Sequence, residues 1–296
     1  MKHNQKCGYF FRILSGLFLL SNIYSQTIEA NFNEISNLEM ILNKCAEYCA
    51  KLNDVSLSFF CKERIVEKKM LLPPRAEEKF KSDLWGYQTI QPLGLSLKKG
   101  KNVYIFDYQL VRNNYNTEEH RALLEHNGQK KHQNDVQLKT KFYTYENILF
   151  GPIGLLSESQ QQDYNYKIIK EESYKGESTY IIEVTPLSSQ TSRILYGRIW
   201  ITKSDLSILK IEWEQKSVKN YQETEVIGLS LRATPKLNLS AEYDYYKNGI
   251  RFPSKFSFKE VYIIKRREGR TKYLRTDLSI EYNNYKFIEV EIDVSF

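Results

Sequence analysis

The chain has 296 residues, of which 41% are hydrophobic and 27% are charged, and its formal net charge is +7. This balance excludes a wholly disordered chain and a bundle of membrane-spanning helices, and the length suffices for one large β domain or two ordinary domains. The 22 tyrosines and 15 phenylalanines favour β-strands.

The first 25 residues (1–25) have the pattern of a cleavable signal peptide. A basic beginning precedes a short apolar stretch at residues 13–20, and Ser25 offers a small residue before a cut at Gln26. A membrane anchor is the alternative, but spanning needs about 20 apolar residues. Cys7 precedes the apolar stretch, so it cannot carry the lipid of a bacterial lipoprotein. We therefore expect an exported, soluble, periplasmic protein of residues 26–296.

Removal of this segment changes the charge of the chain. The segment contains three basic residues and no acidic ones, so the net charge falls from +7 to +4. This mild charge allows weak attraction to anionic surfaces, and we expect no binding to nucleic acid. The three basic residues are Lys2, Lys6 and Arg12.

Residues 33–52 are predicted to form an amphipathic helix, because their apolar residues recur at helical spacing. A strand is expected over residues 55–68, and residues 69–101 are expected to form an irregular surface insertion rich in proline, glycine and charge. The apolar stripe of the helix consists of Ile35, Leu38, Ile41, Leu42, Cys45, Cys49 and Leu52.

Cysteine content agrees with export. Cys45, Cys49 and Cys61 remain after cleavage, and an oxidising compartment favours one disulfide with one thiol left over. Cys45 and Cys49 lie one helical turn apart and pair poorly, so the bond is expected to join Cys61 to one of them. A zinc site is the alternative, although no histidine lies nearby.

From residue 102 onward the pattern is mostly β. Strands are expected at 103–113 and 118–128, and a helical interruption is expected at 142–162. Hairpins follow with turns at Lys175-Gly176, Ser204-Asp205 and Asn248-Gly249, and a last alternating strand covers 289–296. One antiparallel sheet with a few helices on one face accounts for this order.

The hairpin at residues 197–213 contains two of the three tryptophans of the chain. With its tip at Ser204-Asp205, Trp200 would lie opposite Leu209, and alternation would add Ile211 and Trp213 to the same face. This apolar face is either part of a filled core or the wall of a cavity for a hydrophobic ligand. Periodicity allows both interpretations.

A search for catalytic motifs is negative. The sequence has no G-x-S-x-G, no H-E-x-x-H, no phosphate-binding loop and no G-x-G-x-x-G. The histidines His120, His126 and His132 are interpreted as solvated strand residues. The basic run Lys265–Lys272 is expected to form a hairpin turn at Glu268-Gly269, either simply solvated or in contact with anionic lipid or a partner. We expect no enzyme activity, no cofactor and no metal.

Several stretches, in order along nearly the whole mature chain, resemble a bacterial envelope family related to the outer-membrane lipoprotein-sorting proteins, the LolA/LolB-like superfamily. The pattern at residues 176–213, in which a strand ending in proline precedes a Trp-Ile-x-Lys-x-Asp hairpin, is the most fold-like part. The stretches are YCAKLNDVSLSFFCKE, EEHRALLEHNGQKK, LFGPIGLLS, GRIWITKSDLSILKIEW, KNGIRFPS and YKFIEVEIDVSF.

The resemblance implies a mainly β (α+β) fold, in which a curved antiparallel sheet forms an incomplete β-barrel with a few helices on its apolar concave side. It also implies a single domain over 26–296 and a carrier or sensor of lipids or acylated proteins, with a possible envelope protein partner and peripheral membrane contact. The pattern of the family pairs Cys49 with Cys61, which leaves Cys45 free. The insertion at 69–101 departs from the shorter carriers.

Three other interpretations compete with the carrier. The first is a non-enzymatic envelope scaffold with a filled core. The second is an outer-membrane barrel, which charge on both faces of several strands opposes. The third is an enzyme without a recognisable motif. Lipid that co-purifies with the protein would distinguish the carrier from the scaffold.

Overall fold

The computed structural model describes residues 37–53, 57–69, 100–113, 116–136, 138, 148–187, 195–218, 221–266 and 269–288. The expected signal peptide (1–25), nearly all of the expected insertion (69–101), the turn at Glu268 and the last strand (289–296) lie outside these residues. They remain predictions.

The chain divides into two compact units, residues 1–44 and residues 45–296. The N-terminal helix, expected at 33–52, is helical at 37–53 in the described residues, so it begins in the first unit and ends in the second. The contacts given below all belong to the second unit. No described helix has both the length and the hydropathy that crossing a membrane requires.

Strands make up most of the second unit, as the sequence predicted. The main strands are β1 (Leu57–Lys69), β2 (Gly100–Asn113), β3 (Asn116–His126), β4 (Gln129–Gln133), β5 (Tyr164–Tyr174), β6 (Glu177–Pro186), β7 (Gly197–Thr202), β8 (Ile208–Trp213), β9 (Thr234–Glu242), β12 (Lys255–Arg266) and β13 (Gly269–Phe287). The remaining elements are β10 (Tyr245–Lys247), β11 (Ile250–Phe252), α4 (Ile153–Leu156), α5 (Glu158–Gln161), η1 (Gln215–Ser217) and α6 (Tyr221–Ser230).

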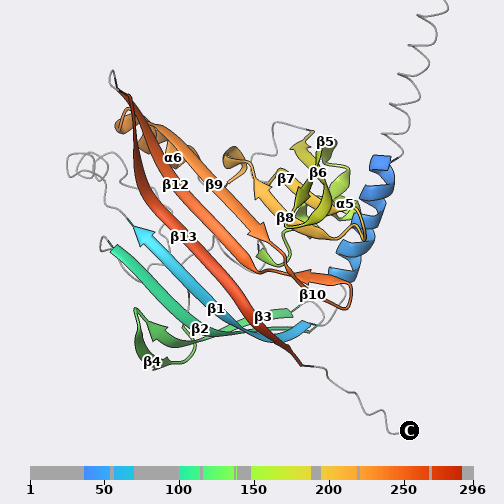
Figure 1. Cartoon of the computed structure of the whole chain (residues 1–296), viewed down its shortest axis with the longest axis horizontal. Helices are drawn as coiled ribbons and strands as arrows, with labels where there is room; N and C mark the ends of the chain where they lie inside the picture. Colours follow the sequence, from blue (N-terminus) through green and yellow to red (C-terminus); the bar gives the residue numbers. More distant parts are fainter. Residues whose placement is uncertain are drawn as a thin grey trace, which may run out of the picture. The chain divides into compact units, whose positions relative to one another are not determined.

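Eleven of the described strands form one antiparallel sheet in the order β4-β3-β2-β1-β13-β12-β9-β8-β7-β6-β5. Strands β4 and β5 stand at its two ends and do not pair with each other, so the sheet is open (Figure 1). Among the described residues, strands β10 and β11 pair only with each other, as a separate hairpin. The prediction of a mainly β fold with an incomplete barrel is confirmed.

Strand β1 shows why the two faces of this sheet differ. Its buried residues alternate from Phe59 to Glu67, while Lys62 and Arg64 point to the other face and pair with Asp107 and Glu281 of the neighbouring strands. Alternation therefore gives one buried face and one face that carries charge. We call the buried one the inner face.

Strand register continues the inner face across the sheet. Residues that pair directly point to the same side, so a row of partners marks one face. One such row, from β8 to β2, consists of Ile211, Ala241, Phe256, Ile280, Ile65 and Tyr104, all of them buried.

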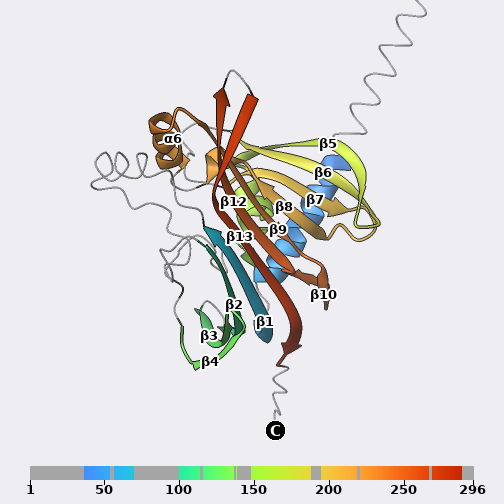
Figure 2. The same ribbon diagram turned by 60° about the vertical axis from the view of Figure 1, so that its left-hand side comes forward.

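The sheet curls around the segment at residues 148–156, which includes α4. At one end of this segment, the guanidinium carbon of Arg112 on β2 lies 4.5 Å from the ring centre of Phe150. At the other, the hydroxyl of Tyr166 on β5 donates to the carbonyl of Leu155 at 2.5 Å. Strands β2 and β5 are third and eleventh in the sheet, so this segment lies on the concave side, and Figure 2 shows the change in strand direction. The expected helical interruption is confirmed over its described part.

Two of the expected hairpin turns occur at the expected residues. Lys175-Gly176 connects β5 to β6, and Asn248-Gly249 connects β10 to β11. All four residues have positive φ angles of 53°, 87°, 54° and 77°, as type I′ turns require. The third turn, near Ser204-Asp205, also connects two strands, but its pairing differs from the expected one.

Candidate ligand-binding site

The register of the β7–β8 hairpin corrects the predicted face. Trp200 lies opposite Lys210, not Leu209, and a β-bulge follows between Trp200 and Ile201. The bulge places one extra residue, Leu209, in β8, and a shift of one residue moves side chains to the other face. The four residues predicted to share a face are therefore divided between two.

Trp200 and Leu209 lie on the outer face, where they form a small buried cluster with Ile181 and Tyr174. The ammonium of Lys210 lies 4.3 Å from the ring centre of Trp200, and the indole nitrogen donates to Glu172 at 3.1 Å. These charged neighbours cover the cluster on the solvent side.

Ile211 and Trp213 lie on the inner face. Ile211 pairs with Ala241 of β9, and Trp213 pairs with Leu239 and contacts the ring of Phe256 at 6.5 Å between ring centres. Trp213 also borders an open groove with Gln215 and Lys236 near the start of β9.

A second concave feature lies on the inner face between β1, β2, β13 and the 148–156 segment. We call it the aromatic hollow. It is nearly filled by side chains, because its free volume is only about 10 Å³, which is room for about one water molecule. Its lining residues are Phe59, Tyr108, Leu110, Glu119, Ile148, Leu149, Pro253, Tyr282 and Tyr285.

Aromatic rings from β1, β2 and β13 line this hollow, and a ring of β11 packs against them. The ring of Phe59 lies between those of Tyr285, Phe252 and Tyr108, at 5.3, 5.8 and 6.1 Å between centres. Phe252 belongs to the β10–β11 hairpin, and Tyr245 of the same hairpin contacts Tyr285 at 4.8 Å. Tilted and edge-on ring pairs of this kind add stability beyond the area that they bury. The hairpin thus closes one side of the aromatic cluster.

One corner of the hollow is charged. Arg121 of β3 forms two hydrogen bonds with Glu63 of β1, at 2.8 and 3.2 Å, and a third with Oε1 of Glu119 at 3.1 Å. The hydroxyl of Tyr108 donates to the same Oε1 at 2.7 Å, and the guanidinium carbon of Arg121 lies 4.5 Å from the centre of its ring. We call these four residues the polar corner.

Electrostatics in the polar corner follow from burial. Burial raises the pKa of Tyr108, and the neighbouring charge of Glu119 raises it further. For Arg121, burial opposes the charged form, but the carboxylate of Glu63, together with Tyr108 and Glu119, outweighs this effect and raises the pKa. Tyr108 is therefore neutral and Arg121 is charged, so the formal charges of the corner sum to −1.

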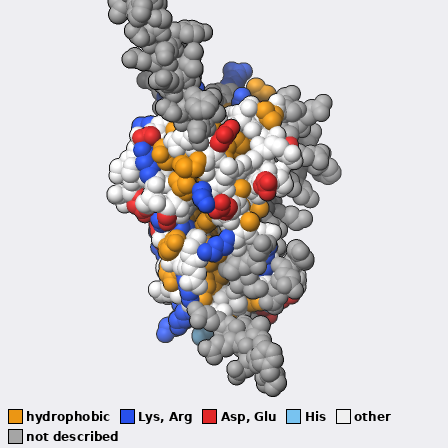
Figure 3. All heavy atoms as spheres, turned by 90° about the vertical axis from the view of Figure 1, so that its right-hand side faces the viewer, with side chains coloured by type: hydrophobic (Ala, Val, Ile, Leu, Met, Phe, Trp, Pro, Cys, Tyr) orange, Lys and Arg blue, Asp and Glu red, His pale blue; other side chains and the backbone are white. Residues whose placement is uncertain are grey.

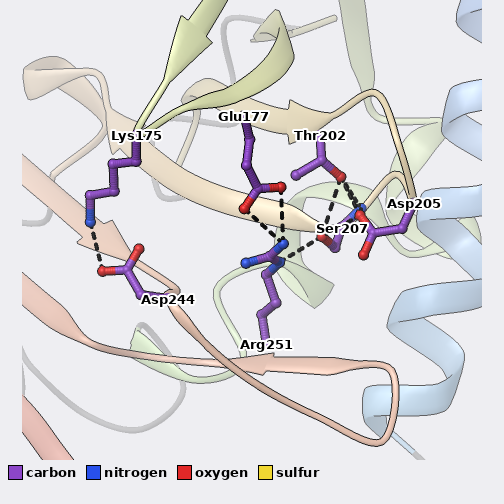
Figure 4. Close-up of polar contacts among 7 residues, drawn as sticks. All are labelled: Lys175, Glu177, Thr202, Asp205, Ser207, Asp244 and Arg251. Carbon is purple, nitrogen blue, oxygen red and sulfur yellow. Dashed lines mark hydrogen bonds and ion pairs between the residues drawn. The ribbon is translucent and has the colours of Figure 1, made fainter.

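A polar network holds the β10–β11 hairpin on its other side (Figure 4). Arg251 of β11 donates to both carboxylate oxygens of Glu177 at 3.3 Å and to the hydroxyl of Ser207 at 2.6 Å. Lys175 donates to Asp244 just before the hairpin at 2.6 Å. These contacts connect the hairpin to the turns of the β5–β6 and β7–β8 hairpins.

The predicted Cys49–Cys61 disulfide is absent, because Cys45, Cys49 and Cys61 are all buried free thiols. Cys49 lies in the N-terminal helix, and its thiol is 3.5 Å from the carbonyl of Pro152 in the 148–156 segment. Cys61 lies on the inner face of β1 beside Tyr285. The two side chains therefore pack in different surroundings.

The other surfaces of the described residues suggest no chemistry of their own. Among these residues, no three histidine, cysteine or carboxylate side chains lie close enough to hold a metal ion. His126 stacks on Tyr104 with 4.6 Å between ring centres. On the face shown in Figure 3, basic and acidic side chains are interspersed over the described residues, as is usual for a solvated surface.

Sequence reasoning missed the aromatic hollow. The alternation in β1 and β2 was visible as Phe59-x-Cys61 and as Phe106-x-Tyr108-x-Leu110. The sequence did not show that these strands lie beside the 148–156 segment, because that position depends on how the sheet curls. The alternation of apolar residues in β1 and β2 would have identified the lining residues of these strands, but not the hollow between them.

Comparisons with known proteins give the following similarities. A family model described only as an uncharacterized protein matches residues 153–236. No curated protein matches the chain significantly. Among solved structures, the chain is similar to an outer membrane lipoprotein-sorting protein domain from Vibrio parahaemolyticus, at 10% identity and a TM-score of 0.34, over 85% of this chain and 92% of that chain.

Two further structures are similar. One is a LolA superfamily protein from Nitrosomonas europaea, at 12% identity and a TM-score of 0.30, over 85% of this chain and 94% of that chain. The other is a DUF1329 family protein from Desulfovibrio piger, at 12% identity and a TM-score of 0.33, over 87% and 94%.

Proposed function

We propose that this chain is a non-enzymatic carrier or sensor that binds a lipid or an acylated protein in the aromatic hollow. The observation that carries the proposal is the lining of the hollow, which is apolar except at one corner and lies on the concave side of an open sheet. Burial of an acyl chain there would contribute about 0.8 kcal/mol for each methylene group. Lipids and lipoproteins are the partners that fit this lining.

The size of the hollow limits what it holds without rearrangement. Ligand sites commonly occupy about 300–1,000 Å³, whereas the free volume of the hollow is only about 10 Å³, so the closed hollow has no room for an acyl chain. An acyl chain therefore requires a wall of the hollow that moves. The β10–β11 hairpin is the best candidate for a wall that moves. Within the described residues its strands pair only with each other, so it can shift without breaking the main sheet, and its outer side is attached through polar contacts that can open.

Ile211 and Trp213 stay in the proposal as inner-face residues that a longer ligand would reach. Trp200 and Leu209 do not, because they lie on the outer face. The proposed setting is the periplasm, reached through the signal peptide at 1–25, with peripheral membrane contact and an envelope protein partner as further parts of the proposal.

A scaffold with a filled core is the second candidate. The observation that favours it is the close packing of the inner face, where Phe256, Phe258 and Ile280 are at most 1% exposed. A filled inner face would leave the hollow as an ordinary packing defect.

Blocking the hollow distinguishes these two functions. Leu110→Phe adds bulk to its lining, so we expect at least a tenfold loss of affinity for a fluorescent acyl probe. Leu229→Phe makes the same change on α6, where the side chain is 78% exposed, and should bind like the wild type. Native mass spectrometry of protein from its own envelope should show bound lipid. A lipid-free mass together with no probe binding would support the scaffold.

A further inference from the structure

The polar corner of the aromatic hollow contains one carboxylate oxygen that the protein leaves available. Oε1 of Glu119 accepts two hydrogen bonds, from Tyr108 and Arg121. Oε2 makes none within the described residues, and the side chain of Glu119 is 20% exposed and lines the hollow. A ligand in the hollow therefore meets a strong acceptor at this end.

The other groups of the corner offer little to an anionic ligand. All hydrogen bonds of Arg121 described above go to Glu63 and Glu119, and its side chain is only 8% exposed. Tyr108 already donates its proton to Glu119. An arriving carboxylate would meet a formal charge of −1, and Nη1 of Arg121, which makes no hydrogen bond among the described residues, belongs to a side chain that is only 8% exposed.

We propose that the hollow selects amphiphiles whose head group donates hydrogen bonds and is neutral or cationic, with Oε2 of Glu119 as the acceptor. This inference rests on the proposed function, because it names the ligand class of the same site. Hydrogen bonds to an ionised acceptor are stronger than neutral ones, and partial burial strengthens them further. Glu119 is thus a specificity-determining residue, and a free fatty acid is a poor ligand.

A series of twelve-carbon amphiphiles tests the proposal. Dodecylamine, dodecanol and dodecanoate share one chain and differ only in the head group, and each would compete with the neutral probe N-phenyl-1-naphthylamine for the full chain. We expect dodecylamine and dodecanol to displace the probe at concentrations at least tenfold lower than dodecanoate. Equal or tighter binding of dodecanoate would overturn the inference while leaving the proposed function intact.

The variant Glu119→Gln removes the negative charge and keeps an acceptor for Tyr108. It should reduce the preference for dodecylamine over dodecanoate at least tenfold and weaken dodecanol less than dodecylamine, because an alcohol can also accept a hydrogen bond from the new amide. Glu118→Gln is the matched control, since Glu118 is the preceding residue of β3 and its side chain is 59% exposed. An equal change in both variants would contradict a role for Glu119 in particular.

The wild-type series is decisive even if Glu119→Gln fails to fold, because it compares ligands on one protein. If neither the probe nor any amphiphile binds, the proposed function is wrong, and this inference falls with it.

Discussion

Buried thiols are the clearest residue-scale feature with a chemical consequence. Burial raises the pKa of Cys45 to about 12, and burial together with the neighbouring Cys45 raises the pKa of Cys49. Burial also raises the pKa of Cys61, and the charge of Glu63 adds to this effect. Because the thiolate is the reactive form, these cysteines should be inert while the chain is folded.

We predict that iodoacetamide at pH 8 leaves all three cysteines unmodified in the folded chain and modifies all three in denaturant without reductant. Peptide mass spectrometry of protein from its own envelope measures both states. Cys49 and Cys61 that stay unmodified in denaturant, while Cys45 reacts, would show that the disulfide implied by the family resemblance does form. Mapping after reduction is the control, since it must reveal all three sites.

The inner face also contains charged side chains, which a purely apolar binding surface would not need. Glu63, Glu67 and Glu260 are at most 1% exposed, and Arg121 and Arg275 form ion pairs with Glu63 and Glu260. Such pairs seldom add net stability, because desolvation offsets much of their attraction. Of these groups, only the Arg121–Glu63 pair adjoins the hollow, through the hydrogen bond of Arg121 to Glu119.

At the scale of elements, the β10–β11 hairpin is the part most suited to move. Its inner side packs on the rings of Phe59 and Tyr285, while its outer side depends on Arg251 and on the Lys175–Asp244 pair. The side chains of Lys175 and Asp244 are 42% and 41% exposed, and ion pairs at such exposure contribute little. Arg251, at 10% exposure, is the stronger of the two attachments.

Replacing Arg251 with Met should loosen this hairpin without unfolding the sheet. The loss of its bonds to Glu177 and Ser207 is expected to lower the local opening free energy by about 1–2 kcal/mol. Hydrogen exchange at residues 245–252 should become about 5- to 30-fold faster, since each 1.4 kcal/mol is a factor of ten. Uptake of the acyl probe should be faster as well.

Arg198→Met is the matched control for this experiment. Arg198 is 53% exposed and forms a long ion pair with Glu183 at 3.6 Å, so its loss should not change exchange in the hairpin. Faster exchange throughout β1, β12 and β13 in Arg251→Met would contradict a local role and indicate general destabilisation.

Some elements of the fold could be predicted from the sequence and others could not. Strands and two of the three turns could be predicted, because alternation and Asn-Gly or Lys-Gly pairs are local signals. The register between β7 and β8 could not be predicted from the sequence. Asp205 accepts hydrogen bonds from the amide and hydroxyl of Ser207, and Leu206 has a φ of 54°, so the turn takes up extra residues and produces the bulge. The aromatic hollow depends on contacts between residues far apart, which periodicity does not encode.

At the scale of the whole second unit, the curled sheet surrounds many phenolic hydroxyls. Burial raises the pKa of Tyr108, Tyr243, Tyr282 and Tyr285 well above 10. A tyrosine in the unfolded chain ionises near 10, so the folded state binds these protons more tightly than the unfolded state. The resulting stability is fully present below pH 10 and is lost as the pH rises towards the pKa values of the folded state.

This linkage predicts cooperative alkaline unfolding. Between pH 10 and pH 11, each such tyrosine should lower the free energy of unfolding by about 1 kcal/mol, so four together remove about 4 kcal/mol. The free energy of unfolding of a domain is commonly only about 5–15 kcal/mol, so this loss is a large part of it. Circular dichroism and tyrosinate absorbance at 295 nm, measured against pH, should contain a shared transition above pH 10.

Tyr282→Phe provides the discriminating variant, because the hydroxyl of Tyr282 makes no hydrogen bond within the described residues. The variant removes one ionising group without removing a hydrogen bond, so its shared transition should move to higher pH. If the tyrosinate signal instead rose fully near pH 10 while the circular dichroism stayed constant, the hydroxyls would be open to solvent in the folded chain. The inner face would then be far looser than the packing of its rings indicates, and a ligand could enter without displacing the hairpin.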